Sequence, residues 1–199
     1  MKLNIEQKIF LISGSAGAGK DSVLRVLKRK KDLYYVITTT TRAPRKEEGQ
    51  GNPYYFIPKE KFLELINTGG LLEYENVYSD HYYGVTKKEV ENAFNSNKPI
   101  IWQIEYRGFR NIIKMFPGQV VSIFILPPSL KIARQRMERR KGDSPTIIEE
   151  RLELAKKEIV ASKEYDHTIV NKENKLDETV TEVLQIINQE TDKKIKDIK

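Results

Sequence analysis

A glycine-rich loop, "SGSAGAGKDSVL" from Ser13 to Leu24, has residue types and spacing suited to holding phosphate groups. It follows the apolar run "IFLI" and precedes a helical pattern, and this context gives the two glycines and the lysine their meaning. Glycines let backbone N–H groups converge on phosphate oxygens, and the helix N-terminus and the lysine add positive charge. The alternative is a glycine-rich turn between a strand and a helix. We expect a nucleotide-binding loop made of Ser15, Ala16, Gly17, Ala18, Gly19, Lys20, Asp21 and Ser22.

The residue after Lys20 departs from the usual pattern of such loops. Asp21 stands where a serine or threonine hydroxyl normally meets Mg²⁺, and Ser22 follows one position later. We expect Ser22 and Asp21 to contact the metal ion, directly or through water. A carboxylate is also stable in a first helical turn, so a solvated helix start is the alternative for Asp21.

A second group of polar residues lies downstream, in "TTTTRAPRKEEGQGNPYYF". Arg42 and Arg45 are three residues apart and precede Tyr54 by a turn that contains glycine. Two guanidinium groups suit a phosphate dianion, and a tyrosine hydroxyl adds a further donor. This segment therefore predicts a site for a second phosphate group.

The following segment, "GGLLEYENVYSDHYYGVT", adds Glu73 and Tyr83. Guanine presents adjacent N1–H and N2–H₂ donors, which a carboxylate accepts. With the arginines before them, these residues would hold a nucleoside monophosphate by its phosphate and by its base.

An arginine-rich stretch follows further on, and in it Arg136 and Arg140 share one helical face because they are four residues apart. Guanidinium groups stabilise the charge that develops during phosphoryl transfer. A basic surface helix paired with neighbouring glutamates is the alternative. Arginine clusters also bind nucleic acid, but the sequence has no helix-turn-helix, RRM or KH pattern, so we expect no nucleic-acid partner.

Short apolar runs alternate with helical patterns along the chain, which favours a parallel sheet wrapped by helices. The predicted strands are 8–13, 34–38, 99–104, 120–126 and 167–170, and the predicted helices are 20–31, 149–162 and 179–188. The stretch 40–85 breaks this rhythm and reads as an insertion with its own small sheet.

We therefore predict an α/β fold in one domain, residues 1–199. It would carry an inserted mixed acceptor lobe at 38–90, a small helical arginine-rich lid at 130–155 and a frayed basic tail at 190–199.

Composition limits the classes of function. The chain has 199 residues, 39% of them hydrophobic, which is enough for one compact core. The absence of cysteine excludes disulfides, thiol catalysis and cysteine metal sites. The net charge of +7 favours anionic ligands. The apolar run near the N-terminus is too short for a signal sequence or a membrane span, so we expect a cytoplasmic protein without membrane contact.

The strings "TTRAPR", "LLEY", "YYG", "FILPPS" and "YDHTIVN", in this order after the glycine loop, resemble those of guanylate kinases. The resemblance extends to about Asn171. It implies a P-loop NTPase fold and transfer of a phosphoryl group from ATP, with Mg²⁺, to GMP and also to dGMP.

The resemblance also implies roles for individual residues. Lys20, Arg136, Arg140 and Arg151 would be catalytic, the last three as lid arginines, and Asn171 would lie near ATP. The GMP site would consist of Thr38, Arg42, Arg45, Tyr54, Glu73, Tyr83, Val85 and Glu105.

Several positions differ from the family pattern. Val85 replaces a serine or threonine, Gln103 and Glu105 replace two aspartates, and Arg107 replaces a glutamine. Asp21 adds a carboxylate near the phosphates while Gln103 removes one, and our hypothesis is that the two changes compensate.

Two alternatives stay open. "GKDS" also resembles the loop of ribose bisphosphate phosphokinase, so a small phosphorylated sugar is a second candidate acceptor. A non-catalytic guanylate-kinase-like module that binds phosphopeptides is the other, although such modules typically lack the loop lysine and the lid arginines. The sequence leaves a monomer and a homodimer equally open.

Overall fold

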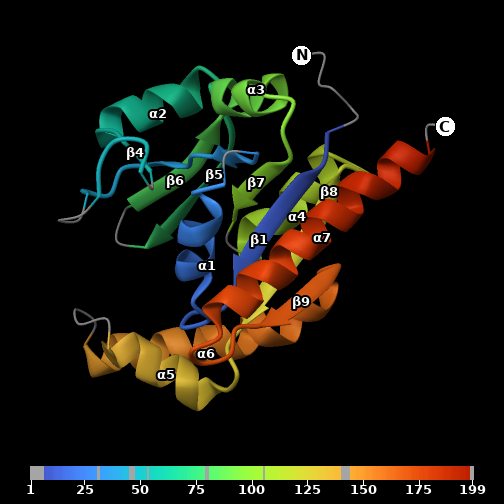
Figure 1. Cartoon of the computed structure of the whole chain (residues 1–199). Helices are drawn as coiled ribbons and strands as arrows, with labels where there is room; N and C mark the ends of the chain where they lie inside the picture. The colour runs from blue at the N-terminus through green and yellow to red at the C-terminus, as the bar shows by residue number, and fades with distance from the viewer. Residues whose placement is uncertain are drawn as a thin grey trace.

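The central element of the molecule is a five-stranded parallel sheet (Figure 1). A computed structural model describes residues 7–30, 32–44, 48–52, 54–78, 81–104, 106–139 and 144–197. The strand order is β2-β7-β1-β8-β9. The strands are β1 (Ile9–Gly14), β2 (Tyr34–Val36), β7 (Ile100–Gln103), β8 (Val120–Leu126) and β9 (His167–Val170). Each lies within or overlaps a predicted strand, so the predicted parallel core is confirmed.

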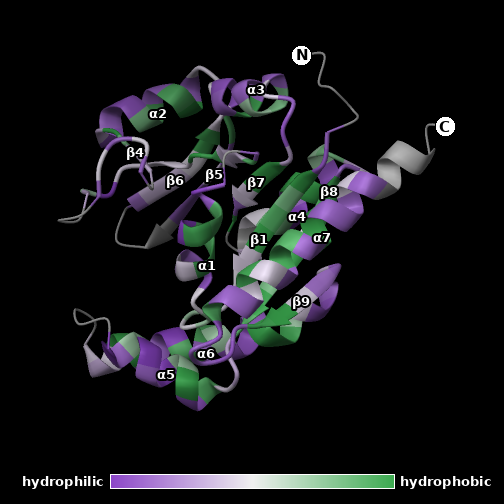
Figure 2. Cartoon of the chain, in the orientation of Figure 1, coloured by the Kyte–Doolittle hydropathy of each residue, from purple (hydrophilic) through white to green (hydrophobic). Residues whose placement is uncertain are grey.

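Helices cover both faces of this sheet, which explains why its strands are apolar runs rather than alternating patterns. On one face, α1 (Lys20–Leu27) and α7 (Leu176–Asp197) pack through residues such as Leu24 and Val183. On the other face, α3 (Lys87–Asn95) and α4 (Tyr106–Met115) pack through residues such as Phe94 and Phe109. Figure 2 shows the central strands coloured as hydrophobic beneath these helices.

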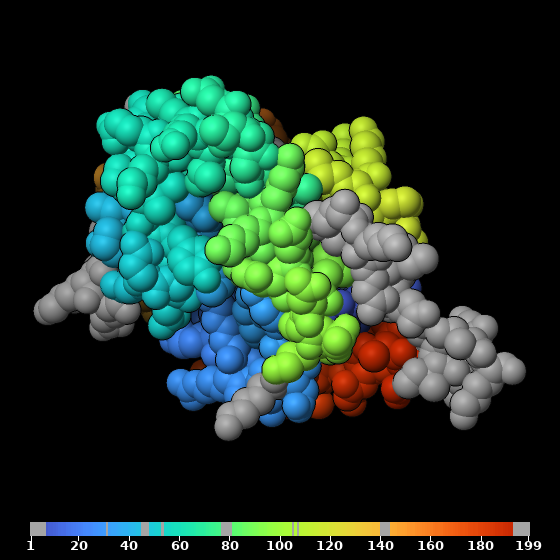
Figure 3. All heavy atoms as spheres, turned by 90° about the horizontal axis from the view of Figure 1, so that it is seen from above, coloured from blue at the N-terminus to red at the C-terminus, as the bar shows by residue number. Residues whose placement is uncertain are grey.

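The predicted inserted lobe has its own four-stranded mixed sheet, in the order β4-β3-β6-β5. Its elements are β3 (Thr39–Thr40), β4 (Tyr55–Phe56), α2 (Lys59–Asn67), β5 (Leu71–Tyr78) and β6 (His81–Thr86). Strands β3 and β4 pair in parallel, while β6 pairs antiparallel with both β3 and β5. In Figure 3 the residues of this lobe that are coloured cyan and teal gather on one side of the face seen from above.

The predicted lid consists of α5 (Leu130–Arg139) and α6 (Pro145–Ala161), which pack on each other through Ala133, Met137, Ile148 and Leu152. Ser144 caps α6 by accepting the N–H of Ile147, and a proline begins the helix, where its missing N–H costs nothing. A short 3₁₀ turn (Ser162–Glu164) then leads to β9. In Figure 1 the lid and the inserted lobe lie at opposite ends, with α1 between them.

The last helix is longer than its predicted range of 179–188. Helix α7 runs to Asp197, so the backbone is helical through most of 190–199, where we predicted a frayed tail. Among the described residues, no helix is both long and apolar enough to cross a membrane.

Candidate functional site

The glycine loop connects β1 to α1 and is shaped by a tight turn. The N–H of Ala18 donates to the carbonyl of Ser15 at 3.0 Å, and Gly17 has a φ of 74°. A Cβ at Gly17 would lie 2.6 Å from the carbonyl oxygen of Ala133 on α5. Gly19, with a φ of 86°, then precedes the first turn of α1. These left-handed positions require glycine, and they give the loop the form expected of a phosphate cradle.

Lys20 begins α1 directly after the loop and is 8% exposed. Asp21 is exposed in the first helical turn, and Ser22 is half-buried beside it, with its N–H donating to the carbonyl of Gly19 at 3.0 Å. Lys20, Asp21 and Ser22 therefore all lie in the first turn of a helix, where the sequence predicted a helix start.

Asn171 and Arg136 stabilise the loop by donating hydrogen bonds to backbone carbonyl groups. Asn171 donates from Nδ2 to the carbonyl of Ala18 at 2.8 Å and accepts from Thr179 at 3.1 Å. Arg136 donates from Nη1 to the same carbonyl at 3.0 Å and from Nη2 to the carbonyl of Asn171 at 2.8 Å. Burial lowers the pKa of the Arg136 guanidinium, against the opposing charge of Glu173. In this structure Arg136 lies on the loop backbone, not over an open site as the lid role implied.

Glu158 also contacts the loop, and the sequence reasoning missed it. It lies on α6, is 7% exposed, and accepts the N–H of Ala16 through Oε2 at 3.3 Å. The signal was a single carboxylate on the apolar face of the predicted helix 149–162, three residues after Ala155. A charged side chain on a buried helical face needs a polar partner.

In the inserted lobe, three of the predicted phosphate-binding residues come together. The Arg42 guanidinium lies 5.7 Å from the centre of the Tyr54 ring, and the rings of Tyr54 and Tyr83 are 5.8 Å apart. Arg42 also pairs with Glu48, whose two oxygens lie 3.0 and 2.8 Å from Nη2. Burial alone would lower the pKa of Arg42, but the hydrogen bonds and charges of Glu48 and Tyr83 raise it. The sequence did not predict Glu48 because only the turn between Arg42 and Glu48 brings the two side chains together.

Of the predicted base-binding residues, Glu73 and Thr38 are half-buried. A Cβ on Gly108 would lie 3.1 Å from Oε2 of Glu73, so the carboxyl is close to the start of α4. Burial, and secondly the charge of Glu75, raise the pKa of Glu73 to about 7. Val85 pairs with Glu73 in the sheet, but its side chain is 0% exposed and packs in the core. Val85 therefore presents no surface to a ligand in this conformation, unlike the prediction.

The remaining predicted residues are placed only in part. Arg151 is half-buried on α6. Arg45, Glu105 and Arg140 lie outside the described residues.

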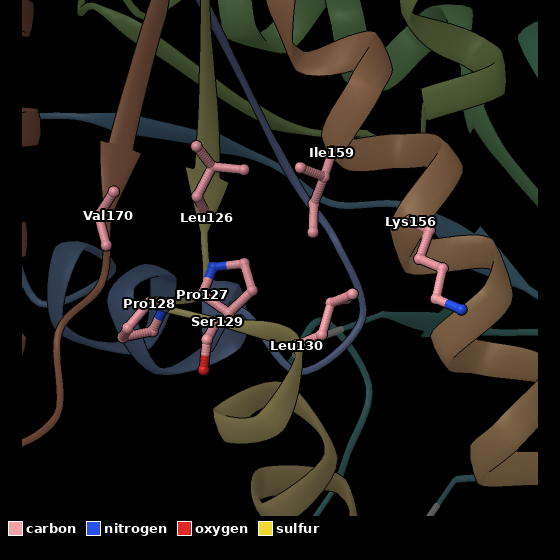
Figure 4. A pocket seen from close by; sticks show the side chains of 8 residues that line it. All are labelled: Leu126, Pro127, Pro128, Ser129, Leu130, Lys156, Ile159 and Val170. Atoms are coloured by element: carbon pink, nitrogen blue, oxygen red, sulfur yellow. The ribbon is translucent and has the colours of Figure 1, made fainter.

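A separate apolar hollow lies between the end of β8 and α6 (Figure 4). Leu126, Pro127, Leu130 and Ile159 are among its lining residues, and Lys156 lies at its edge. None of the predicted site residues lines it. The candidate site is therefore defined by the loop and the lobe.

Comparison with known proteins supports the same assignment. The guanylate kinase family model matches residues 6–190. The chain belongs to the guanylate kinase family. The guanylate kinase of Wolbachia pipientis wMel is 35% identical over 99% of this chain and 97% of its own length. That of Porphyromonas gingivalis is 39% identical over 90% of this chain and 94% of its own length.

A solved structure agrees with the sequence relatives. The crystal structure of guanylate kinase from Anaplasma phagocytophilum superposes with a TM-score of 0.75 and 30% identity, covering 93% of this chain and 86% of the other. Membership of the guanylate kinase family accounts for the presence, in one chain, of the glycine loop, the inserted lobe with its arginine–tyrosine group and the helix pair α5–α6.

Proposed function

We propose that this protein transfers the γ-phosphoryl group of ATP to GMP, giving ADP and GDP, and that dGMP is a second acceptor. The observation that carries the proposal is that two groups of residues suited to phosphate lie in separate parts of the chain. One is the loop that ends in the buried Lys20, and the other is the group of Arg42, Tyr54 and Tyr83 in the inserted lobe. Two such groups, one in the core and one in the inserted lobe, suit a donor and an acceptor nucleotide.

The proposed reaction needs placement and charge neutralisation more than proton transfer, because the oxygen of the acceptor phosphate is already anionic. Lys20 and the loop N–H groups would hold the phosphates of ATP. Arg42 is now paired with Glu48, and a phosphate dianion would compete for the same guanidinium fork. Glu48 would thus keep Arg42 oriented until GMP arrives.

On the base side, Glu73 would accept the N1–H and N2–H₂ groups of guanine. Thr38 lies half-buried where the chain enters the inserted lobe and would support the same base. Glu105 would add a second acceptor, and Arg45 a second guanidinium at the phosphate.

The family's reaction uses Mg²⁺, and the described residues suit a metal ion held mainly by the nucleotide. Ser22 and Asp21 lie next to Lys20 at the start of α1. Among the described residues no three potential ligands of the His, Cys, Asp and Glu types lie together. Mg²⁺ in such sites takes most of its ligands from phosphates and water. Ser22 and Asp21 would supply the protein's share, and the ion would neutralise phosphate charge.

The lid would complete the site. Arg151 and Arg140 would approach the transferring group when the lid closes, while Arg136 would stay on the loop backbone that it already contacts. Closure would also exclude water, which otherwise competes with GMP for the phosphoryl group.

Release of ADP, measured with a coupled assay, tests the proposal. GMP, dGMP, AMP and a ribose bisphosphate are compared as acceptors, each with and without Mg²⁺. We expect turnover with GMP and dGMP that depends on Mg²⁺, and a loss of at least a hundredfold in kcat for Lys20→Met. If only the ribose bisphosphate is turned over, it and not GMP is the acceptor. No ADP with any acceptor, together with binding of a phosphopeptide, would instead support the non-catalytic module.

A further inference from the structure

The tip of the phosphate loop is attached to the lid through one residue, Ala16. Its N–H donates to Oε2 of Glu158 on α6 at 3.3 Å. Its side chain packs against the small apolar cluster that joins α5 and α6, which includes Ala133 and Leu152. Backbone and side chain of Ala16 thus both contact the lid.

Packing alone does not explain a glutamate at position 158. The buried face of α6 is otherwise formed by apolar residues, Ile148, Leu152 and Ala155, and Glu158 continues that face at 7% exposure. Burying a carboxylate costs free energy that an apolar side chain of the same size would not. The hydrogen bond to a backbone N–H gives the carboxylate a function at this position.

The other lid helix holds the next part of the loop. Arg136 on α5 donates to the carbonyls of Gly17 and Ala18 at 3.4 and 3.0 Å. The backbone of Ala133 is so close to Gly17 that a Cβ there would clash. Both lid helices therefore contact consecutive residues of the loop tip. Glu158 on α6 accepts a hydrogen bond from the loop, and Arg136 on α5 donates hydrogen bonds to it.

We propose that Glu158 is a positioning residue for the ATP-binding loop: by holding the N–H of Ala16, it fixes the loop tip against the base of the lid. The loop tip is then already ordered before ATP binds, so binding does not have to order it. This proposal rests on ATP binding at the loop, as proposed above. It predicts that loss of the contact weakens ATP and leaves GMP unaffected.

Glu158→Met removes the acceptor and keeps the side-chain volume, whereas Glu158→Gln keeps one acceptor oxygen. We expect Glu158→Met to raise KM for ATP and the Kd of a fluorescent ADP analogue about tenfold, with KM for GMP unchanged. Glu158→Gln should restore most of the affinity. Glu153→Met on the exposed face of α6 is the matched control and should change neither constant.

The donor side can be removed as well. The hydrogen bond between Ser15 and Ala18 and the positive φ of Gly17 are those of a type II turn, so Ala16 occupies the position that accepts proline. Ala16→Pro therefore removes the N–H and keeps the turn. It should raise KM for ATP as Glu158→Met does. The KM for ATP of the double variant should be no higher than that of the single variant with the higher KM.

Additive losses in the double variant would overturn the proposal, because they would show that the two residues act separately. An equal rise in KM for both nucleotides, or a fall in melting temperature with KM for ATP unchanged, would assign Glu158 to stability alone. Failure of the proposed function is distinguishable: the unmodified protein would then form no ADP with GMP at all.

Discussion

At the scale of single residues, the carboxyl of Glu73 combines partial burial with a like-charged neighbour. Burial, and then the charge of Glu75, raise its pKa to about 7 from the usual value near 4.5. The pKa of Glu73 in the folded state lies above its value in the unfolded state. The free energy of unfolding therefore falls as pH rises from 4.5 to about 7, because the carboxyl ionises more readily in the unfolded chain. Guanine donors require the ionised form, so GMP binding should pull the pKa down and release a proton.

We therefore predict that KM for GMP rises as pH falls below about 7, approaching tenfold per pH unit. Steady-state kinetics between pH 5.5 and 8.5 measure this, with KM for ATP as the internal control. Glu73→Gln should bind GMP weakly and lose the pH dependence above about pH 6, where the phosphate of GMP is a dianion. Glu75→Gln, which removes the neighbouring charge, should shift the profile to lower pH. A flat profile for the unmodified protein would refute the role of Glu73 as an ionised acceptor.

The sequence predicted those site residues whose type and spacing alone indicate phosphate binding. Arg42, Arg45, Tyr54 and Tyr83 were predicted to hold one phosphate group. Of these, the described residues Arg42, Tyr54 and Tyr83 lie together. Glu158 was missed because its partner is a backbone N–H more than a hundred positions away, which only the tertiary fold reveals. Val85 was assigned by its place after "YYG", but sheet alternation and core packing decide where its side chain lies.

At the scale of elements, the start of α3 connects the inserted lobe to the core sheet. Thr86 accepts the N–H of Glu89 at 3.1 Å and caps the helix. Glu89, 4% exposed, accepts the N–H of Ile37 at 3.0 Å and the hydroxyl of Tyr34 at 3.4 Å. Ile37 lies just where the chain leaves β2 for the lobe. The first turn of α3 therefore fixes both connections between the core and the lobe: the segment that leaves β2 and the segment that returns from β6.

Glu89→Ala should lower the free energy of unfolding by about 1–3 kcal/mol, because the partly buried N–H of Ile37 loses its charged acceptor. Thr86→Ala should cost about 1 kcal/mol through loss of the cap. Urea denaturation measures both values. The double variant should lose less than the sum, because both residues hold the same turn. Glu91→Ala, exposed on the same helix, should stay within about 0.5 kcal/mol of the unmodified protein.

Long apolar runs were the predictable elements. Strands β8 and β9 have the predicted bounds, 120–126 and 167–170. Strand β8 is an apolar run buried on both faces, whereas β9 is an edge strand in which only Ile169 is buried. Strands β3 and β4 have two residues each, too few for any periodicity, so the sequence indicated only an insertion with a sheet. The end of α7 was underestimated because its last turns carry few apolar residues.

At the scale of the whole molecule, the inserted lobe and the lid lie at opposite ends of the core, and the proposed phosphate-binding residues are divided among these three parts. The inserted lobe carries Arg42, Tyr54 and Tyr83, and the lid carries Arg151 (Figure 1). The loop with Lys20 belongs to the core between them. Direct transfer requires donor and acceptor oxygens to meet in a near-attack geometry. Each nucleotide should therefore draw its own part inward.

Small-angle X-ray scattering tests this movement on the intact chain. We expect GMP alone and a non-hydrolysable ATP analogue alone each to reduce the radius of gyration, and both together to give the smallest value. AMP in place of GMP should leave the lobe open, because adenine lacks the donors that Glu73 accepts. Arg42→Ala should abolish the GMP step and keep the ATP step, since Arg42 lies in the lobe and not in the lid. An unchanged radius with both nucleotides bound would show that the arrangement in Figure 1 is already the closed one. Catalysis would then need no movement of either part.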